Sequence, residues 1–185
     1  FTMHISGEIK FDGDKSIAHR ALMISSICKG KSILYNMPNS EDIKSTISVL
    51  RECGVNIKFN DGIATVFGGA LSVPTKILDC GNSGTTMRLL AGLLAGQNIP
   101  ATLTGDSSLL KRPMKRIIDP LNKMGSQIIS NGQFAPLHLF GAKINSTNFY
   151  MDIESAQVKS SIILSAIGGK GVTQIKGKIN TRDHL

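Results

Sequence analysis

The sequence contains no tryptophan, only two tyrosines and only three cysteines among its 185 residues. Surfaces that stack nucleic-acid bases use several exposed aromatic side chains, so this composition disfavours a nucleic-acid partner. Cys28, Cys53 and Cys80 are odd in number and widely spaced, and none has a histidine or a second cysteine at ligand spacing. We therefore expect no disulfide framework and no metal site, and we interpret these cysteines as small buried apolar side chains.

Long apolar runs and an excess of acidic residues are also missing. The longest apolar runs, such as residues 89–95 and 162–167, fall far short of the roughly 20 residues of a membrane-spanning helix, and no signal peptide pattern opens the sequence. We expect a cytoplasmic protein with no membrane partner. The 21 basic and 13 acidic residues give a net charge of +8, and their scattered placement favours a small phosphorylated ligand over nucleic acid.

An internal repeat divides the chain into α/β units. The first unit, about residues 13–70, is predicted to contain a helix, a strand, a helix and two strands, over residues 16–29, 32–37, 41–52, 55–59 and 63–67. The second unit, about residues 75–142, repeats this order after a leading strand, over residues 75–80, 84–95, 101–104, 111–124, 126–130 and 137–140. Gly54 and Gly125, which end equivalent helices, lie 71 residues apart.

A third unit, about residues 148–185, stops halfway. Its predicted elements are a strand over 149–153, a helix over 155–167 and a strand over 172–178, and the sequence ends where the second helix is expected. A half-unit cannot cover its own apolar face. We therefore interpret residues 1–185 as part of a longer protein, with a shortened natural terminus as the alternative.

The starts of the first helices in units one and two have the pattern of an anion site. Gly13 and Gly81 are each followed seven residues later by an arginine, Arg20 or Arg88, one turn inside a helix. The first turn of a helix presents unpaired N–H groups and the positive end of the helix dipole, which attract phosphate or carboxylate. Lys15 adds a flexible cation. Ordinary helix caps with surface ion pairs are the alternative, and Arg88 itself is interpreted mainly as a structural brace.

Two further segments carry candidate ligands. In residues 105–121, Arg112 directly precedes Pro113, and proline fits the first turn of a helix. Arg112 is therefore predicted at a helix start, where its guanidinium can bind a carboxylate or phosphate through two hydrogen bonds. A solvated basic face is an equally good interpretation. Ser155 and Gln157 open the helix of the third unit, where they can bind a hydroxylated ligand or simply cap the helix.

Four motifs together resemble one enzyme family. In order and spacing, GDKSIAHRALMISS, LDCGNSGTTMRLLAGLLAG, LTGDSSLLKRPMKRIIDPLNKMG and SAQVKSSIILSA are similar to the amino-terminal lobe of the 5-enolpyruvylshikimate-3-phosphate synthases, and the similarity covers essentially the whole chain. The resemblance implies two lobes, each of three βαβαββ units around a pseudo-threefold axis. It implies a transferase of the shikimate pathway with no cofactor and no metal, whose substrates are shikimate 3-phosphate and phosphoenolpyruvate.

The resemblance also implies site residues. Lys15 matches a catalytic lysine that touches both substrates. The implied ligands of shikimate 3-phosphate are Ser16, Arg20, Ser155, Ala156, Gln157 and Arg182. The implied contacts of phosphoenolpyruvate are Gly84 and Arg112, with Asn82 supporting their loop. The acid and base carboxylates of the family lie in a carboxy-terminal lobe that this sequence lacks, so the chain alone is expected to bind shikimate 3-phosphate weakly and not to turn over.

Two other functions are compatible with a repeat of this kind. The related UDP-N-acetylglucosamine enolpyruvyl transferases share the repeat, but they use a cysteine in the loop that here reads GDSSLLKRP, which contains none. An RNA-binding or RNA-end-processing domain would suit the net charge of +8. Such a domain would lose affinity steeply with salt.

Overall fold

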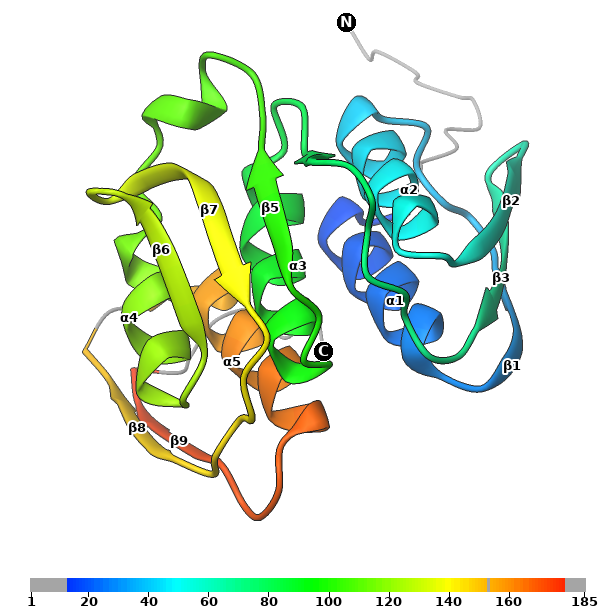
Figure 1. Ribbon diagram of the computed structural model, residues 1–185. Helices are drawn as coiled ribbons and strands as arrows, with labels where there is room; N and C mark the ends of the chain where they lie inside the picture. Colours follow the sequence, from blue (N-terminus) through cyan, green and yellow to red (C-terminus); the bar gives the residue numbers. More distant parts are fainter. Residues whose placement is uncertain (1–12, 153, 179–185) are drawn as a thin grey trace, which may run out of the picture.

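The bounds of the helices and strands follow the predicted repeat. The computed structural model describes residues 13–152 and 154–178 (Figure 1). Its elements are α1 (Lys15–Ile27), β1 (Gly30–Leu34), α2 (Glu41–Glu52), β2 (Asn56–Asn60), β3 (Ile63–Gly68), β4 (Leu78–Asp79), α3 (Gly84–Gly96), β5 (Ala101–Thr104), the 3-10 helix η1 (Leu109–Lys111), α4 (Lys115–Lys123), β6 (Gln127–Asn131), β7 (Phe134–Phe140), β8 (Asn148–Met151), α5 (Ala156–Gly168) and β9 (Gln174–Gly177).

The pairing of the strands repeats from one unit to the next. In the first unit β3 lies between β1 and β2, and both pairs are antiparallel. In the second unit β7 lies between β5 and β6 in the same way, and β4 adds to β5 in parallel. The third unit shows the parallel pair β8–β9, which repeats β4–β5. The repeated α/β organisation predicted from the sequence is thus confirmed in the topology.

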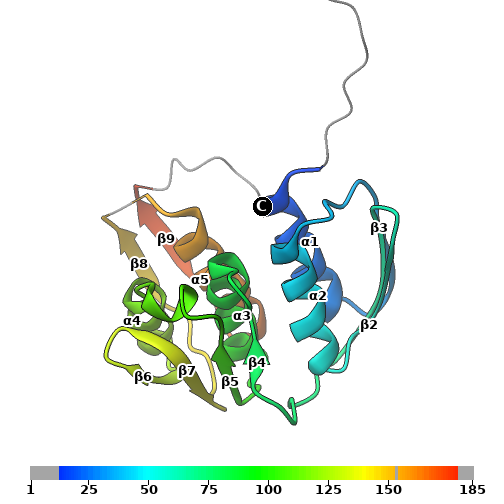
Figure 2. The same cartoon turned by 90° about the horizontal axis from the view of Figure 1, so that it is seen from above.

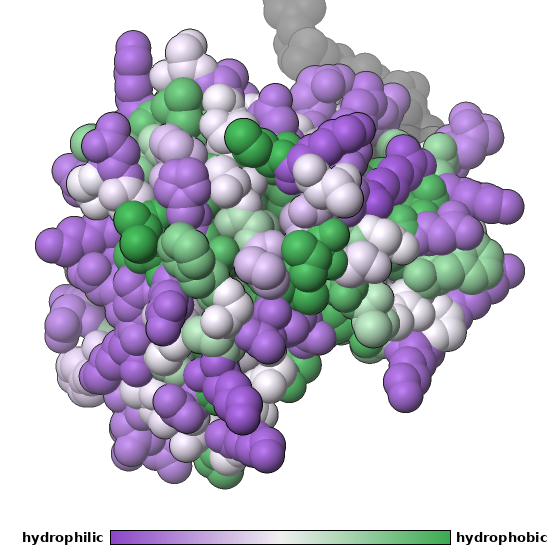
Figure 3. Space-filling view, in the orientation of Figure 1, coloured by the Kyte–Doolittle hydropathy of each residue, from purple (hydrophilic) through white to green (hydrophobic). Residues whose placement is uncertain are grey.

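The helices lie inside and the three sheets lie outside (Figure 2). Helix α2 packs against α1 and α3, and α4 packs against α3 and α5, so the second helix of each of the first two units packs against the first helix of the next unit. The sheets turn alternate apolar side chains inward, as with Ala64 and Val66 of β3, and all three units share one apolar core. Polar side chains cover most of the face in Figure 3, with apolar ones in small separate groups. None of the helices in the described ranges is long and apolar enough to cross a membrane.

Glycines allow α3 and α5 to lie very close to each other. A Cβ atom added to Gly92 would stand 2.2 Å from the carbonyl oxygen of Ser161, and one added to Gly96 would stand 2.6 Å from the carbonyl oxygen of Ser165. Real Cβ atoms do not approach backbone oxygens this closely. Helix α3 is therefore buried along most of its length, and its first turn is held against the first turn of α5.

The predicted helix over residues 111–124 is wrong in its first turn. The chain forms η1, then leaves the helical conformation at Arg112, whose φ and ψ are −86° and 131°, and α4 begins only at Lys115. Pro113 explains the break, because the residue before a proline is disfavoured from the α conformation. Arg112 is therefore in an extended loop, three residues before α4, and does not stand at a helix start.

Two further expectations need correction. The strand predicted over residues 75–80 is reduced to the two residues of β4. Cys28 is exposed at the end of α1, whereas Cys53 and Cys80 are buried as expected. Burial raises the pKa of Cys53 to about 11 and that of Cys80 to about 12, so both thiols stay protonated at neutral pH.

Candidate anion-binding site

Hydrogen bonds join the first turns of α1, α3 and α5. Arg20 on α1 donates from Nε to Ser160 Oγ at 2.9 Å and from Nη2 to the carbonyl oxygen of Ala156 at 3.4 Å, both on α5. Gln157 on α5 donates from Nε2 to Thr85 Oγ1 of α3 at 2.9 Å. The three helix starts singled out in the sequence therefore meet at one end of the helical core.

The start of α1 presents Lys15. Asp14 caps the helix by accepting a hydrogen bond from the amide of Ile17 at 2.9 Å. Lys15 Nζ lies 2.6 Å from Asp42 Oδ2, and about half of the Lys15 side chain is exposed. Asp42, in the first turn of α2, was missed by the sequence reasoning, because its position there fits an ordinary helix-dipole residue.

Arg20 is nearly buried between α1 and α5. It is 3% exposed, and its Nη1 donates to the carbonyl oxygen of Ser16 at 2.7 Å. Burial lowers the pKa of Arg20, and the charge of Asp14 opposes this effect. A guanidinium has five N–H donors, and three of those of Arg20 are used on oxygens of the described residues, which leaves two without a partner among those residues.

Two guanidinium groups meet at Gly84, the first residue of α3. A Cβ atom added to Gly84 would stand 2.9 Å from Arg88 Nη1 and 3.5 Å from Arg112 Nη1. Within the described residues, neither arginine is at ion-pair distance from a carboxylate. Burial lowers the pKa of Arg88, and the charges of Arg116 and Arg112 lower it further. Two arginines without an ion-pair partner among the described residues, placed at a helix N-terminus, are a favourable environment for an anion.

Asn82 holds Arg112 in this position. Its amide oxygen accepts a short hydrogen bond from Arg112 Nη2, and its carbonyl oxygen accepts from Arg112 Nη1 at 3.2 Å. Its Nδ2 donates to Asp106 Oδ2 at 2.6 Å, and Asp106 Oδ1 accepts from the amide of Leu109 at 2.7 Å. The hydrogen bond from Asn82 is the main cause of the lowered pKa of Asp106. Asp106 is a second site residue that sequence reasoning missed.

Asp106→Ala is expected to weaken anion binding without unfolding the chain. The substitution removes the acceptor of Asn82, so Arg112 loses its fixed position, and the affinity of this site for a small anion such as inorganic phosphate should fall about 5- to 10-fold, as for one lost hydrogen bond. Calorimetric titration measures this loss. Glu52→Ala removes the same charge at the far end of α2 and should leave the affinity unchanged. A loss in Glu52→Ala as large as that in Asp106→Ala would contradict a specific role of Asp106 in positioning Arg112.

The start of α5 contributes to the site mainly through Gln157. Ser155 caps the helix by accepting from the amide of Val158 at 3.3 Å. The Gln157 amide oxygen accepts from Arg88 Nη1 at 2.8 Å. Arg88 therefore braces α3 against α5, as the sequence indicated, and also lies beside Gly84. Arg182, the last predicted ligand, lies outside the described residues.

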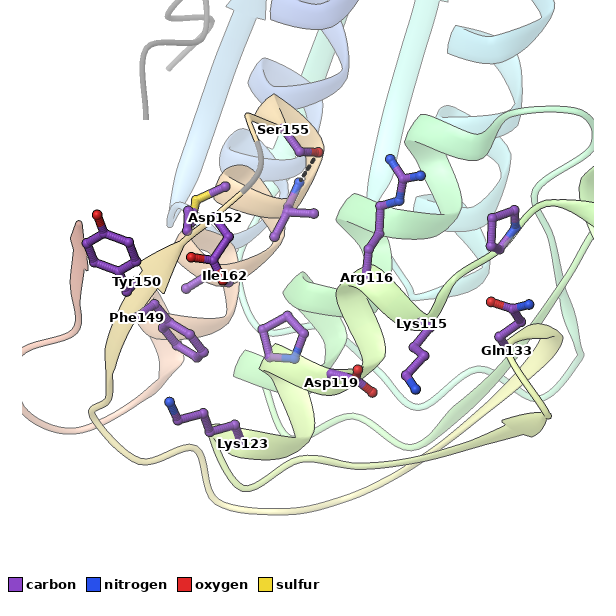
Figure 4. A pocket seen from close by; sticks show the side chains of 14 residues that line it. Lys115, Arg116, Asp119, Lys123, Gln133, Phe149, Tyr150, Asp152, Ser155 and Ile162 are labelled. Carbon is purple, nitrogen blue, oxygen red and sulfur yellow. Dashed lines mark hydrogen bonds between the residues drawn. The ribbon is translucent and has the colours of Figure 1, made fainter. Parts of the chain in front are cut away.

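A groove of about 750 Å³ lies along α4, β8 and α5, and Ser155 is the one candidate ligand from the described residues that lines it (Figure 4). Arg116 of α4 and Ser155 before α5 both line the groove, and Lys123 Nζ lies 5.3 Å from the centre of the Phe149 ring. Apolar side chains such as Phe149 and Ile162 line its floor. Its charged lining is mixed, with the basic residues Lys115, Arg116 and Lys123 and the acidic residues Asp119 and Asp152.

These features define the class of the protein as a lobe built from α/β repeats, with helix starts and arginines gathered at one end. The family model described as EPSP synthase (3-phosphoshikimate 1-carboxyvinyltransferase) matches residues 2–185. The chain belongs to this family.

Relatives support the assignment over nearly the whole chain. The 3-phosphoshikimate 1-carboxyvinyltransferase of Herpetosiphon aurantiacus is 43% identical over 97% of this chain, and that of Petrotoga mobilis is 43% identical over 99%. The solved EPSP synthase of Acinetobacter baumannii superposes with a TM-score of 0.92 at 38% identity over 96% of this chain. The chain spans only 43%, 44% and 42% of these three proteins.

Proposed function

We propose that the chain forms the shikimate-3-phosphate half of an EPSP synthase. In this reaction the 5-hydroxyl of shikimate 3-phosphate adds to C2 of phosphoenolpyruvate, and the resulting tetrahedral intermediate expels inorganic phosphate. One observation carries the proposal: the first turns of α1, α3 and α5 converge, with the guanidinium groups of Arg88 and Arg112 at Gly84. In the described residues, neither arginine is at ion-pair distance from a carboxylate.

The site residues take roles that follow from their positions. Lys15 is the proposed catalytic residue, because its ammonium group is the exposed cation at the start of α1 and Asp42 orients it. Arg112 and the Gly84 backbone are proposed to bind phosphoenolpyruvate. Ser16 and Arg20, with Gln157 across from them, are proposed to bind shikimate 3-phosphate.

We also propose that turnover needs a carboxy-terminal lobe. Support comes from the length of the relatives, of which this chain spans less than half. Support also comes from exposed apolar side chains on helices of the core, Ile17 and Ile24 on α1 and Ile167 on α5, which further chain would cover. The chain alone should bind shikimate 3-phosphate yet release no phosphate from phosphoenolpyruvate. Phosphate release at the rate of a complete enzyme would contradict this.

Arg112→Ala is expected to weaken phosphoenolpyruvate binding about 10- to 100-fold, because a hydrogen-bonded guanidinium contact with an anion contributes about 1.5–3 kcal/mol. The measurement is a calorimetric titration of the 185-residue chain. Lys58→Ala removes one positive charge from the outer strand β2 and serves as the control. If both variants lose affinity equally, the site is not at Gly84, and if the unaltered chain binds neither substrate, the proposed function is wrong.

A further inference from the structure

Buried hydroxyl groups connect α1 to the start of α3. His19 on α1 is 0% exposed, and its Nδ1 lies 2.7 Å from Thr46 Oγ1 of α2. Thr46 Oγ1 lies 2.7 Å from Thr86 Oγ1 of α3, which lies 2.7 Å from Ser83 Oγ. Ser83 caps α3 directly before Gly84. This hydroxyl chain, His19–Thr46–Thr86–Ser83, therefore ends at the candidate site.

Once Thr86 Oγ1 is taken as the donor to Ser83 Oγ, the direction of the rest of the hydroxyl chain follows, since each hydroxyl has one proton. Thr86 donates its proton to Ser83, which also accepts from the Thr86 amide at 3.1 Å. Thr46 then donates to Thr86, and His19 must donate from Nδ1 to Thr46. The carbonyl oxygen of Asp42 is a competing acceptor, but it lies 3.3 Å from Thr46 Oγ1 and 3.4 Å from Thr86 Oγ1, farther than each 2.7 Å link.

The other ring nitrogen of His19 favours the same direction. His19 Nε2 is buried and has no hydrogen-bond partner among the described residues. If the hydroxyl chain ran the other way, Nε2 would carry the proton, and a buried N–H would lack an acceptor. Buried N–H groups without partners are rarer in proteins than buried acceptors without partners. The neutral tautomer with its proton on Nδ1 is therefore the better fit.

We propose that His19 is a positioning residue for the anion site: its Nδ1–H begins a one-way series of hydrogen bonds that fixes Ser83 and the first turn of α3. This inference rests on the function proposed above. In this arrangement Ser83 accepts twice from Thr86, so the Ser83 proton is the one in the series with no acceptor in the described residues. That proton is then free to turn toward an anion bound at Gly84.

The tautomer is tested on the 185-residue chain without any ligand. Imidazole 15N chemical shifts at neutral pH distinguish the two tautomers of a neutral histidine. We expect His19 to be protonated on Nδ1. Protonation on Nε2 would reverse the hydroxyl chain and overturn the proposal.

The positioning role is tested with three variants and phosphoenolpyruvate as the probe. His19→Asn keeps an N–H donor near the position of Nδ1 and should bind within about 3-fold of the unaltered chain. His19→Leu removes the donor and Thr46→Val interrupts the series with a side chain of the same shape, so both should lose about 10-fold. Thr102→Val is the matched control, because Thr102 Oγ1 makes a Thr–His contact with His138 Nδ1 at 3.1 Å on the outer sheet.

Each outcome separates this inference from the proposed function. Full affinity in folded Thr46→Val, or equal losses in His19→Asn and His19→Leu, would overturn the positioning role. If His19→Leu does not fold, the affinity of Thr46→Val for phosphoenolpyruvate decides whether the positioning role holds. If the unaltered chain binds neither phosphoenolpyruvate nor shikimate 3-phosphate, the proposed function fails. Whenever phosphoenolpyruvate does not bind, hydrogen exchange of the Thr86 amide decides the positioning role. That exchange should be about 10-fold faster in Thr46→Val, and an unchanged rate would overturn the inference.

Discussion

Gly92→Ala is expected to lower the free energy of unfolding by about 3 kcal/mol, the upper end of the usual cost of overpacking a core. The new methyl group would stand 2.2 Å from the carbonyl oxygen of Ser161 and 2.7 Å from its Oγ, so α3 and α5 would have to separate. Helix propensity predicts the opposite sign, because alanine is favoured over glycine in a helix interior by about 1 kcal/mol. A measured loss of stability therefore reports the close packing of the two helices.

Urea unfolding of Gly92→Ala provides the measurement, and Gly69→Ala is the matched control. Gly69 has no atom within 4 Å of an added Cβ and no positive φ, so alanine should be neutral there. Binding should fall along with stability in Gly92→Ala, because Ser161 Oγ donates to the carbonyl oxygen of Arg88 at 2.9 Å and the same contact positions Arg88. A neutral or stabilised Gly92→Ala variant would show that the helices are not packed as described.

The order of the elements was predictable because local chemistry determines it. Gly54 and Gly125 both have positive φ, of 85° and 101°, and glycine adopts this conformation at helix ends at the least cost, so they mark equivalent boundaries in two units. The break in the helix before Pro113 could also have been predicted from the sequence, since a proline disfavours the α conformation of the residue before it. The prediction placed Pro113 inside the first turn because basic residues and an apolar pattern continued on both sides.

The partners of the site residues were not predictable from one sequence. Lys15 and Arg112 were recognised as candidate ligands from their expected places at helix starts and from the family resemblance. Asp42, which pairs with Lys15, and Asp106, which binds the Asn82 that holds Arg112, come from other segments of the chain. Hydrogen bonds between residues far apart in sequence leave no periodic pattern. The same holds for His19, which reads as an ordinary helix residue until α2 and α3 pack against α1.

Acidification is expected to destabilise the chain through His19 in a defined pH range. Burial lowers the pKa of His19 from 6.5 to about 4; the Asp42 carboxylate opposes this shift, and the charges of Lys15 and Arg20 add to it. Above pH 6.5 the histidine is neutral in both the folded and the unfolded chain. Between pH 6.5 and about 4 the unfolded chain binds a proton that the folded chain does not, so stability falls as the pH falls.

The loss by pH 4 is expected to be about 3 kcal/mol, since each pKa unit corresponds to about 1.4 kcal/mol. Denaturant unfolding between pH 7.5 and 4 measures it as the difference between the unaltered chain and His19→Asn, which has no group to protonate at this position. His138→Asn, on the outer strand β7, should keep the full pH dependence. If His19→Asn loses as much stability as the unaltered chain over this range, His19 is not the buried neutral group, and the acid sensitivity arises elsewhere in the chain.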